Sequence, residues 1–506
     1  MNRPQFLGSV AAVGASLAVP AGAASAKAVT LDIRTVAWAV RQDLTVHVAS
    51  YNGVVPGPLL RFTEGDRVSM NVRNETADRQ SVHWHGLEVS DRVDGVVELG
   101  TPGVPAHGSR TYQFTVTPSG TRWYHAHTAD GLFSGMFGPL IVDRKNERGN
   151  YDREVVLVLH EFDQQIETVS PMSSIGSEPT TLTSSAGDMG GMMGGGGGMM
   201  GGGGMMGLMD VARYGAFAVN GKALGAGEPI RVRVGERVRF RVINASATLT
   251  HRLAFPGHRF QVTELDGNPV PRPTELDAIE LGVAERVDAI VTMNAPGIWI
   301  LGSTDQSARD KGLGIVVAYD GERGPAQWRD ESRDAFAYAA FANASRAIHA
   351  DGVFDFRLQK GPNGSARWMM NGEEFPNVHP VDVRHGKTYL LRFLNASMLE
   401  HPIHTHGHHF ELVRIDDVAM SGIVKDTVVI RPMGGRAEVL LHADNPFAGR
   451  FLLHCHNEEH MDARHGNDHS LRVLTTAFTP RASGPFSGLL PDVAASIHPP
   501  PTDRRS

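Results

Sequence analysis

Three stretches of this chain share one pattern, in which a glycine precedes an asparagine by nine residues and an alternating apolar and polar run lies between them. Glycine suits a turn before a strand and asparagine a turn after it, and alternation is the period of a β-strand with one buried face. An internal repeat at this scale predicts three copies of one β-domain, each of about 130 to 170 residues. The three pairs are Gly65 and Asn74, Gly235 and Asn244, and Gly386 and Asn395.

Short alternating runs separated by Gly, Pro, Asn and Asp fill the rest of each copy, and amphipathic helical periodicity is scarce. We therefore expect an all-β fold in which each copy is an antiparallel β-sandwich or a small Greek-key barrel. The expected domains are residues 27–146, 150–324 and 340–482, followed by a Pro-rich tail at 483–506. Strands are expected at 44–50, 111–116, 155–160, 287–293, 427–430 and 438–442.

At 506 residues the chain is too long for one core, and its formal net charge of −7 argues against nucleic acid as a partner. No apolar run is long enough to cross a bilayer. Residues 1–26 predict a secretory signal, with basic Arg3, an apolar run and small residues ending at Ala26. Residues 2–7 resemble a twin-arginine export signal in which Pro4 replaces the second arginine. Export to a bacterial periplasm is expected; the alternative is an apolar N-terminal arm.

Residues 187–209 interrupt the strand pattern with runs of glycine and methionine. Such a low-complexity segment cannot pack a core, so we expect a flexible surface loop within the second domain.

Cys455 is the only cysteine, and it lies between His454 and His456, with His460 five residues on. The preceding residues 450–453 predict a strand, whose successive side chains point to opposite faces. His454 and His456 therefore point to one face of the strand and Cys455 to the other. If all three bind metal, they belong to two different metal sites on opposite faces of the strand. A buried inert thiol is the alternative, but the neighbouring histidines favour a metal thiolate.

Four His-x-His pairs occur, all in the first and third copies and none in the second. On a strand, each pair presents two imidazoles on one face, close enough to share or bridge metal ions. One pair alone would be ambiguous, but four pairs beside a cysteine indicate a metal centre. The pairs are His83 and His85, His125 and His127, His404 and His406, and His454 and His456.

The motifs HWHG, HAH, HPIHTHG and HCHNEEH resemble the four copper-binding motifs of three-domain multicopper oxidases, the family of laccases and bacterial cuprous oxidases. The resemblance covers nearly the whole mature chain, including motif order and the ligand-free middle domain. It implies three cupredoxin-like domains and four copper ions: one type 1, one type 2 and a type 3 pair.

Carried over by position, the resemblance makes His401, Cys455 and His460 the type 1 ligands, and His83 and His404 the type 2 ligands. Two imidazoles and a thiolate are also the donors of blue-copper sites. His251 of the middle copy falls near where the other copies carry ligands, but no His-x-His follows it, and we interpret it as structural. The implied type 3 ligands are His85, His125, His127, His406, His454 and His456.

The resemblance further implies that one-electron oxidations at the type 1 site drive the four-electron reduction of dioxygen to water. Asp94 matches the acid that the family keeps after its first motif and would supply protons, although an Asp before Gly also suits a simple turn. Family members with a thioether axial ligand have methionine where this chain has His465, so a three-coordinate copper and an axial nitrogen both stay open. Met461 directly follows His460 and is expected to point elsewhere.

Thioethers select Cu(I), so the Met/Gly-rich loop could collect cuprous ions, with Met398 and Glu400 as further substrate contacts beside His401. We predict Cu(I) as a physiological substrate in copper tolerance, with phenols and other small aromatic reductants as broader ones, and a monomeric protein. The alternatives are a loop without function, a laccase-like oxidase of aromatics alone, a non-catalytic copper-binding protein, and a copper nitrite reductase, which lacks this histidine set. The candidate loop residues are Met192, Met193, Met199, Met200, Met205 and Met206.

Overall fold

The computed structural model describes residues 26–128, 131–147, 149–163, 211–329, 332–362, 367–375, 377–461 and, as backbone, 475–481. Strands dominate these ranges, which confirms the predicted all-β class, and each of the six expected strands is present. Residues 1–25 of the predicted signal, the loop at 187–209, His465 and the tail at 483–506 lie outside the described residues.

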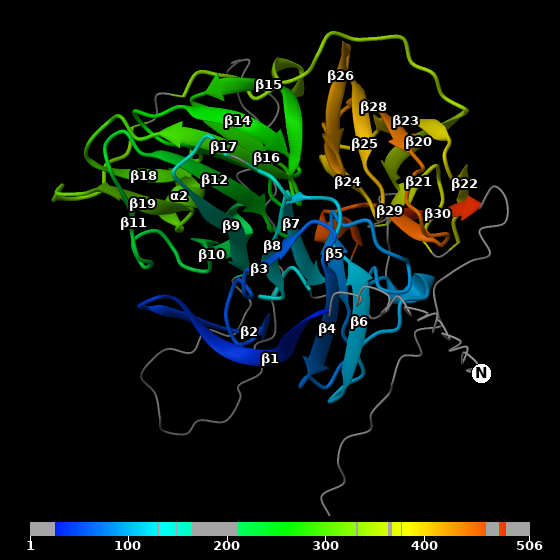
Figure 1. The fold of residues 1–506 in the computed structure, drawn as a ribbon, viewed down its shortest axis with the longest axis horizontal. Helices are drawn as coiled ribbons and strands as arrows, with labels where there is room; N and C mark the ends of the chain where they lie inside the picture. The colour runs from blue at the N-terminus through cyan, green and yellow to red at the C-terminus, as the bar shows by residue number, and fades with distance from the viewer. Residues whose placement is uncertain are drawn as a thin grey trace, which may run out of the picture.

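Six sheets fall into three successive pairs, one pair for each repeat (Figure 1). In Figure 1 the blue and cyan first sandwich lies below, the green middle sandwich at the upper left and the yellow and orange third sandwich at the upper right. The exact domain boundaries given above stay a prediction.

The first sandwich has two four-stranded sheets. One has the order β2 (Leu44–Tyr51), β1 (Lys27–Arg41), β4 (Arg67–Asn74), β6 (Ser109–Thr115). The other has the order β3 (Leu60–Thr63), β8 (Phe137–Asp143), β7 (Gly120–Ala126), β5 (Val82–His85). A short 3₁₀ turn, η1 (Val97–Leu99), lies between β5 and β6.

The middle sandwich has a six-stranded and a five-stranded sheet. The first has the order β10 (Tyr214–Val219), β9 (Arg153–Asp163), β12 (Arg237–Asn244), β17 (Arg286–Thr292), β14 (Phe260–Leu265), β15 (Asn268–Leu276). The second has the order β11 (Ile230–Val232), β19 (Gly314–Tyr319), β18 (Ile298–Ser303), β13 (His251–Ala254), β16 (Ala278–Leu281). The short helix α2 (Gln306–Asp310) follows β18.

The third sandwich repeats this plan after the 3₁₀ turn η2 (Tyr338–Ala340). Its six-stranded sheet has the order β21 (Trp368–Met370), β20 (Gly352–Lys360), β23 (Thr388–Asn395), β28 (Arg436–His442), β25 (Phe410–Ile415), β26 (Val418–Lys425). Its five-stranded sheet has the order β22 (Val381–Arg384), β30 (Thr475–Arg481), β29 (Phe451–Cys455), β24 (His401–Thr405), β27 (Thr427–Ile430). Helix α3 (Glu458–Met461) follows β29.

The recurring asparagine ends the same strand in each sandwich and is buried in all three. Its Oδ1 accepts a hydrogen bond from the backbone N–H two residues on, at Thr76 (2.9 Å), Ser246 (3.1 Å) and Ser397 (2.9 Å). Its amide donates to backbone carbonyls a few residues further along. The repeat is therefore a buried turn that leads into β5, β13 and β24, the strands that carry or align with ligand motifs.

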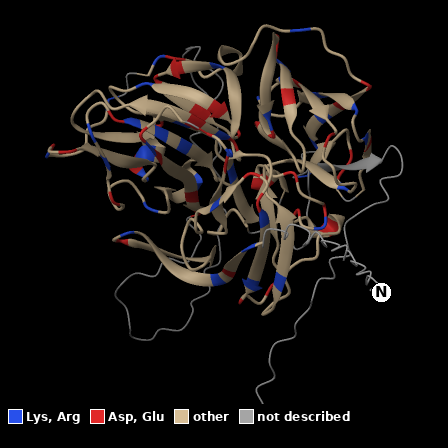
Figure 2. Ribbon diagram, in the orientation of Figure 1, with Lys and Arg blue, Asp and Glu red and all other residues tan. Residues whose placement is uncertain are grey.

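Apolar packing fixes the sandwiches against one another. One buried cluster runs through the middle and third sandwiches, and a second cluster joins the first sandwich to the middle one through residues such as Trp123, Phe162 and Ala218. Basic and acidic residues are interspersed in all three sandwiches (Figure 2). Because the interfaces are continuous with the cores, side chains from distant parts of the sequence can form one rigid site.

Candidate metal centre

Histidines of the first and third sandwiches meet in the interface between them. The first sandwich supplies four imidazoles from β5, β7 and the residue after β7, and the third supplies four from β24, β29 and the residues after them. All are buried except the half-buried His127. The four predicted pairs are thus brought together in one place, and the ring centroids of neighbouring imidazoles lie, for example, 3.8, 5.0 and 5.5 Å apart.

His83 of the first sandwich and His404 of the third face each other through their unprotonated Nε2 atoms. The Nδ1–H of His83 donates to the backbone oxygen of Asp94 (2.7 Å), and the Nδ1–H of His404 donates to that of Asp426 (2.8 Å). Their two Nε2 atoms lie 3.4 Å apart. Two lone pairs facing each other in a buried site repel unless a cation lies between them, so this pair fits a bound metal ion.

A second pair has the same arrangement. The Nδ1–H of His406 donates to Asp94 Oδ2 (2.8 Å) and that of His454 to the backbone oxygen of Cys455 (2.9 Å), while their Nε2 atoms lie 3.0 Å apart. His127 lies close enough to complete a three-nitrogen group, since one ligand atom from each residue falls within 4.8 Å of the others.

The remaining imidazoles present nitrogens that have no hydrogen-bond partner in the described part of the chain: His85 Nδ1, His125 Nε2 and both nitrogens of His456. His85 is oriented in the opposite sense to the others, because its Nε2–H donates to Asp426 Oδ1 (3.1 Å) and leaves Nδ1 free. Buried polar atoms without partners are rare, so several in one interface are what a set of metal ligands would show.

Burial favours the neutral form of seven of these imidazoles. It lowers the pKa of His127 to about 3, and together with neighbouring imidazoles it holds the pKa of most of the others far below the ordinary value of 6.5. Metal ligation requires the neutral form, so the site is ready for metal at any physiological pH. The other histidines affected in this way are His404, His454 and His456.

A second, separate group joins His401, Cys455 and His460, all buried, with their ligand atoms within 4.8 Å of one another. Cys455 Sγ lies 3.2 Å from His460 Nδ1. The Nε2–H of His401 donates to Ser397 Oγ (3.0 Å), which leaves His401 Nδ1 free for a metal. Burial raises the pKa of the Cys455 thiol above its ordinary value, and a bound cation would stabilise the thiolate instead.

Trp368 closes one side of this group, with its ring 4.0 Å from that of His460 and 4.9 Å from that of His401 between centroids. Met461 points away from it, because its Sδ lies 3.2 Å from His454 Nδ1. Met461 therefore does not join the His401, Cys455 and His460 group, as predicted. Sequence reasoning missed Trp368, because a single tryptophan in a short strand carries no spacing signal.

The comparisons with known proteins agree with this geometry. Family models described as multicopper oxidase match residues 32–147, 204–320 and 349–466. This chain belongs to the multicopper oxidases. It is 32% identical over 435 residues to the multicopper oxidase MmcO of Mycobacterium tuberculosis, an alignment that covers 83% of this chain and 82% of that protein.

Two further relatives and one solved structure are also similar to this chain. A copper resistance protein A homolog of Pseudomonas syringae pv. tomato is 23% identical, with 81% of this chain and 87% of that protein covered. Laccase-4 of Thanatephorus cucumeris is 27% identical, with 81% and 83% covered. A crystal structure of a multicopper oxidase from Pseudomonas thermotolerans superposes with a TM-score of 0.67 at 22% identity over 91% of this chain and 100% of that one, which supports the three cupredoxin-like domains.

As a multicopper oxidase the chain is an oxidoreductase that uses dioxygen as acceptor and four copper ions, and it takes a reductant as its other substrate. No helix in the described residues is long and apolar enough to cross a membrane.

The middle sandwich keeps part of the pattern that holds His401. His251 begins β13 as His401 begins β24, and Ser246 Oγ lies 2.8 Å from His251 Nε2, as Ser397 Oγ does from His401. This hydrogen bond agrees with the prediction that His251 has a structural role and binds no metal.

The cysteine and the second histidine have no counterpart there. The residue two positions after the leading histidine pairs with Cys455 in the third sandwich and with Ser303 in the middle one. Five residues beyond, where the third sandwich has His460, the middle one has buried Ala308. The middle copy of this multicopper oxidase therefore holds one of three donors at that position and cannot hold a type 1 copper.

Asp426 is a functional candidate that sequence reasoning missed. It is fully buried directly before β27, contacts His85, and forms a bidentate pair with Arg286 (2.7 and 2.5 Å). Burial alone would raise the pKa of this carboxyl, but the charge and hydrogen bonds of Arg286 hold the pKa well below the ordinary value. A single aspartate before a strand carries no motif, so only the fold reveals it.

The two predicted substrate contacts, Met398 and Glu400, differ in their exposure to solvent. Met398 is 56% exposed, whereas Glu400 is partly buried and accepts a hydrogen bond from Thr250 Oγ1 of the middle sandwich. Burial raises the pKa of Glu400 to about 7.

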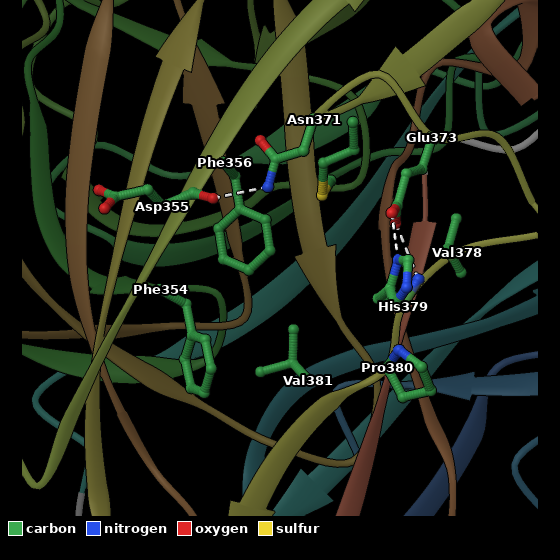
Figure 3. A pocket seen from close by; sticks show the side chains of 10 residues that line it. Phe354, Asp355, Phe356, Asn371, Glu373, Val378, His379, Pro380 and Val381 are labelled. Carbon is green, nitrogen blue, oxygen red and sulfur yellow. Dashed lines mark hydrogen bonds and ion pairs between the residues drawn. The ribbon is translucent and has the colours of Figure 1, made fainter.

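A surface pocket of about 300 Å³ lies elsewhere in the third sandwich, between β20, the turn after β21 and the start of β22 (Figure 3). None of the candidate copper ligands lines it, and its wall is mostly apolar, with Glu373 and His379 at one side. This pocket is therefore separate from the candidate metal centre.

Proposed function

We propose that this multicopper oxidase couples the one-electron oxidation of Cu(I), and of small aromatic reductants, to the four-electron reduction of dioxygen to water, in the service of copper tolerance. The observation that carries the proposal is the connection between the two donor groups. Cys455 belongs to one group, whereas its chain neighbour His454 belongs to the other and the ring of its other neighbour, His456, lies 5.0 Å from that of His125 in the same histidine cluster.

In this proposal His401, Cys455 and His460 bind the type 1 copper, and His83 and His404 bind the type 2 copper. Copper bound in these two groups would accept electrons singly at Cys455 and deliver them to dioxygen at the histidine cluster. Support comes from the ligand atoms left without partners and from the facing Nε2 pairs. The proposed type 3 ligands are His85, His125, His127, His406, His454 and His456.

Asp94 is the proposed proton donor for oxygen reduction. Its carboxylate accepts a hydrogen bond from His406 Nδ1 and lies 3.3 Å from His83 Nδ1, so it contacts a ligand from each sandwich. Its Oδ1 has no hydrogen-bond partner in the described part of the chain. Asp94→Asn would keep the shape but remove the exchangeable proton, and it should lower the rate of oxygen reduction by roughly 10²–10⁴-fold while leaving the type 1 spectrum unchanged.

Cu(I) as substrate rests on soft donors and on the relatives named as copper resistance proteins. We propose that the methionines of the loop at 187–209 collect Cu(I), and that Met398 and Glu400 contact it near His401. Deleting residues 189–206 tests this, because Cu(I) oxidation should fall while phenol oxidation is retained. Equal loss on both substrates, or no loss on either, would contradict the role of the loop.

A laccase-like oxidase of aromatic substrates is the second candidate, since several relatives are named laccases. Steady-state rates on Cu(I) and on a simple phenol, measured on copper-loaded protein, decide between the two. A non-catalytic copper protein would bind copper without oxygen uptake in the presence of either reductant. We also propose export to the periplasm, through a signal at 1–26 that resembles twin-arginine signals, and a monomeric state, which sedimentation would test.

A further inference from the structure

A buried arginine of the middle sandwich contacts the copper centre through one intermediate residue. Arg286, the first residue of β17, has no solvent exposure. Its Nη1 and Nη2 donate to the two carboxylate oxygens of Asp426 in the third sandwich, at 2.7 and 2.5 Å. A bidentate pair of this kind fixes the plane and position of the carboxylate.

The other donors of Arg286 are also engaged. Nη1 donates to the backbone oxygen of Ala284 (3.1 Å), Nη2 to that of Asp266 (3.1 Å), and Nε to that of Thr121 in the first sandwich (3.2 Å). The guanidinium is thus held by all three sandwiches and cannot rotate without breaking several buried hydrogen bonds.

Asp426 passes this constraint to two proposed ligands. Its Oδ1 accepts from His85 Nε2–H (3.1 Å), and its backbone oxygen accepts from His404 Nδ1–H (2.8 Å). A carboxylate paired with arginine only accepts hydrogen bonds, so the proton of His85 must lie on Nε2 and the lone pair on Nδ1. The tautomer of His85 therefore depends on the position of Asp426.

The glycine of the HWHG motif agrees with this arrangement. A Cβ on Gly86, which has a φ of +85°, would lie 2.9 Å from Arg286 Nη2 and 3.0 Å from Asp426 Oδ2. The motif thus leaves room for the arginine and carboxylate directly beside His85.

We propose that Arg286 is a positioning residue for the copper centre: from the domain that binds no copper, it holds Asp426 so that His85 presents Nδ1 to a type 3 copper. The middle domain then takes part in setting the geometry of a site whose ligands all come from the other two. The inference rests on the ligand assignment proposed above.

The test compares Arg286→Met with Arg241→Met in copper-loaded full-length protein. Arg241 is an equally buried arginine of the middle sandwich that bonds Thr121 of the first, but it pairs with Asp288 and Glu154 instead of Asp426. Removing a hydrogen-bonding partner behind a ligand typically weakens metal binding roughly 10- to 100-fold. We expect that loss for the type 3 pair in Arg286→Met, measured by copper retention against a chelator and by the near-ultraviolet absorption of the pair. The thiolate-to-copper band of the type 1 site should be retained.

Arg286→Lys, which keeps the charge but only part of the fork, should recover part of the type 3 signal. If Arg286→Met does not fold, the double variant Arg286→Met/Asp426→Asn removes both charges and leaves no buried carboxylate unpaired. It should show the same selective loss. Equal copper retention and spectra in Arg286→Met and Arg241→Met, or a double variant with an intact type 3 signal, would overturn the inference. If the wild-type protein itself binds fewer than four copper ions, the ligand assignment fails instead, and the two failures are distinguished by that measurement.

Discussion

Substitution of Gly86 by alanine tests the packing of the interface around the copper centre. The new Cβ would meet Arg122 Cδ at 2.8 Å, Arg286 Nη2 at 2.9 Å and Asp426 Oδ2 at 3.0 Å. Contacts under 3.0 Å require the neighbours to move, and these neighbours are buried and hydrogen bonded.

The expected destabilisation has two parts. A left-handed backbone conformation costs alanine about 1–2 kcal/mol relative to glycine. Forcing a methyl group into a filled interior costs about 1–3 kcal/mol more. Gly86→Ala should therefore lower the free energy of unfolding by about 2–5 kcal/mol.

Gly65→Ala is the matched control. Gly65 lies in the same sandwich with nearly the same φ, +86°, but a Cβ there would meet only the flexible end of Lys145, at 3.3 Å. It should therefore lose only the backbone part, about 1–2 kcal/mol. Denaturant unfolding of the metal-free proteins, followed by circular dichroism, measures both losses. Equal losses in the two variants would refute the packing argument.

Three other predictions concern a hydrogen bond to His401, the ionisation of Glu161 and the removal of copper. Ser397→Ala removes the hydrogen bond to His401, so it should weaken type 1 copper binding and shift the thiolate-to-copper band, whereas Ser246→Ala in the middle copy should leave the copper spectra unchanged. Burial raises the pKa of Glu161 from 4.5 to about 7, so the folded protein holds a proton that the unfolded chain releases. The contribution of Glu161 to stability should thus fall by on the order of 3 kcal/mol as pH rises between those values, so the difference in unfolding free energy between the wild type and Glu161→Gln should change by that amount between pH 5 and pH 8. Chelation of copper should lower the thermal midpoint by mass action, and the metal-free protein should lose stability as pH falls below 6.5, since folding lowers the pKa of imidazoles such as His85 and His127. Calorimetry of both forms in the Glu161→Gln background, which removes the opposing contribution of Glu161, measures this across that pH range, and a metal-free variant that gains stability on acidification would contradict it.

The gathering of the histidines could be predicted from the sequence because they recur at alternate positions of a strand, as His83 and His85 do, and so share a face. The repeats likewise indicated the β-sandwiches, because the buried asparagine turn needs the same residue in each copy. Arg286 and Asp426 gave no such signal, since they are single residues 140 positions apart on different sandwiches. Their contact depends on how the sandwiches dock, which is a property of whole interfaces and not of local sequence.

His83 and His404 are separated by 321 positions in the chain, yet their nitrogens face each other across the interface. During synthesis the first sandwich is complete long before the second half of the centre exists. Under the proposed ligand assignment, full copper insertion is therefore a late step of maturation, after the last sandwich has folded and docked. A truncated product that keeps only the N-terminal half would carry four imidazoles without their counterparts, and copper content would report the completeness of the chain as well as its activity.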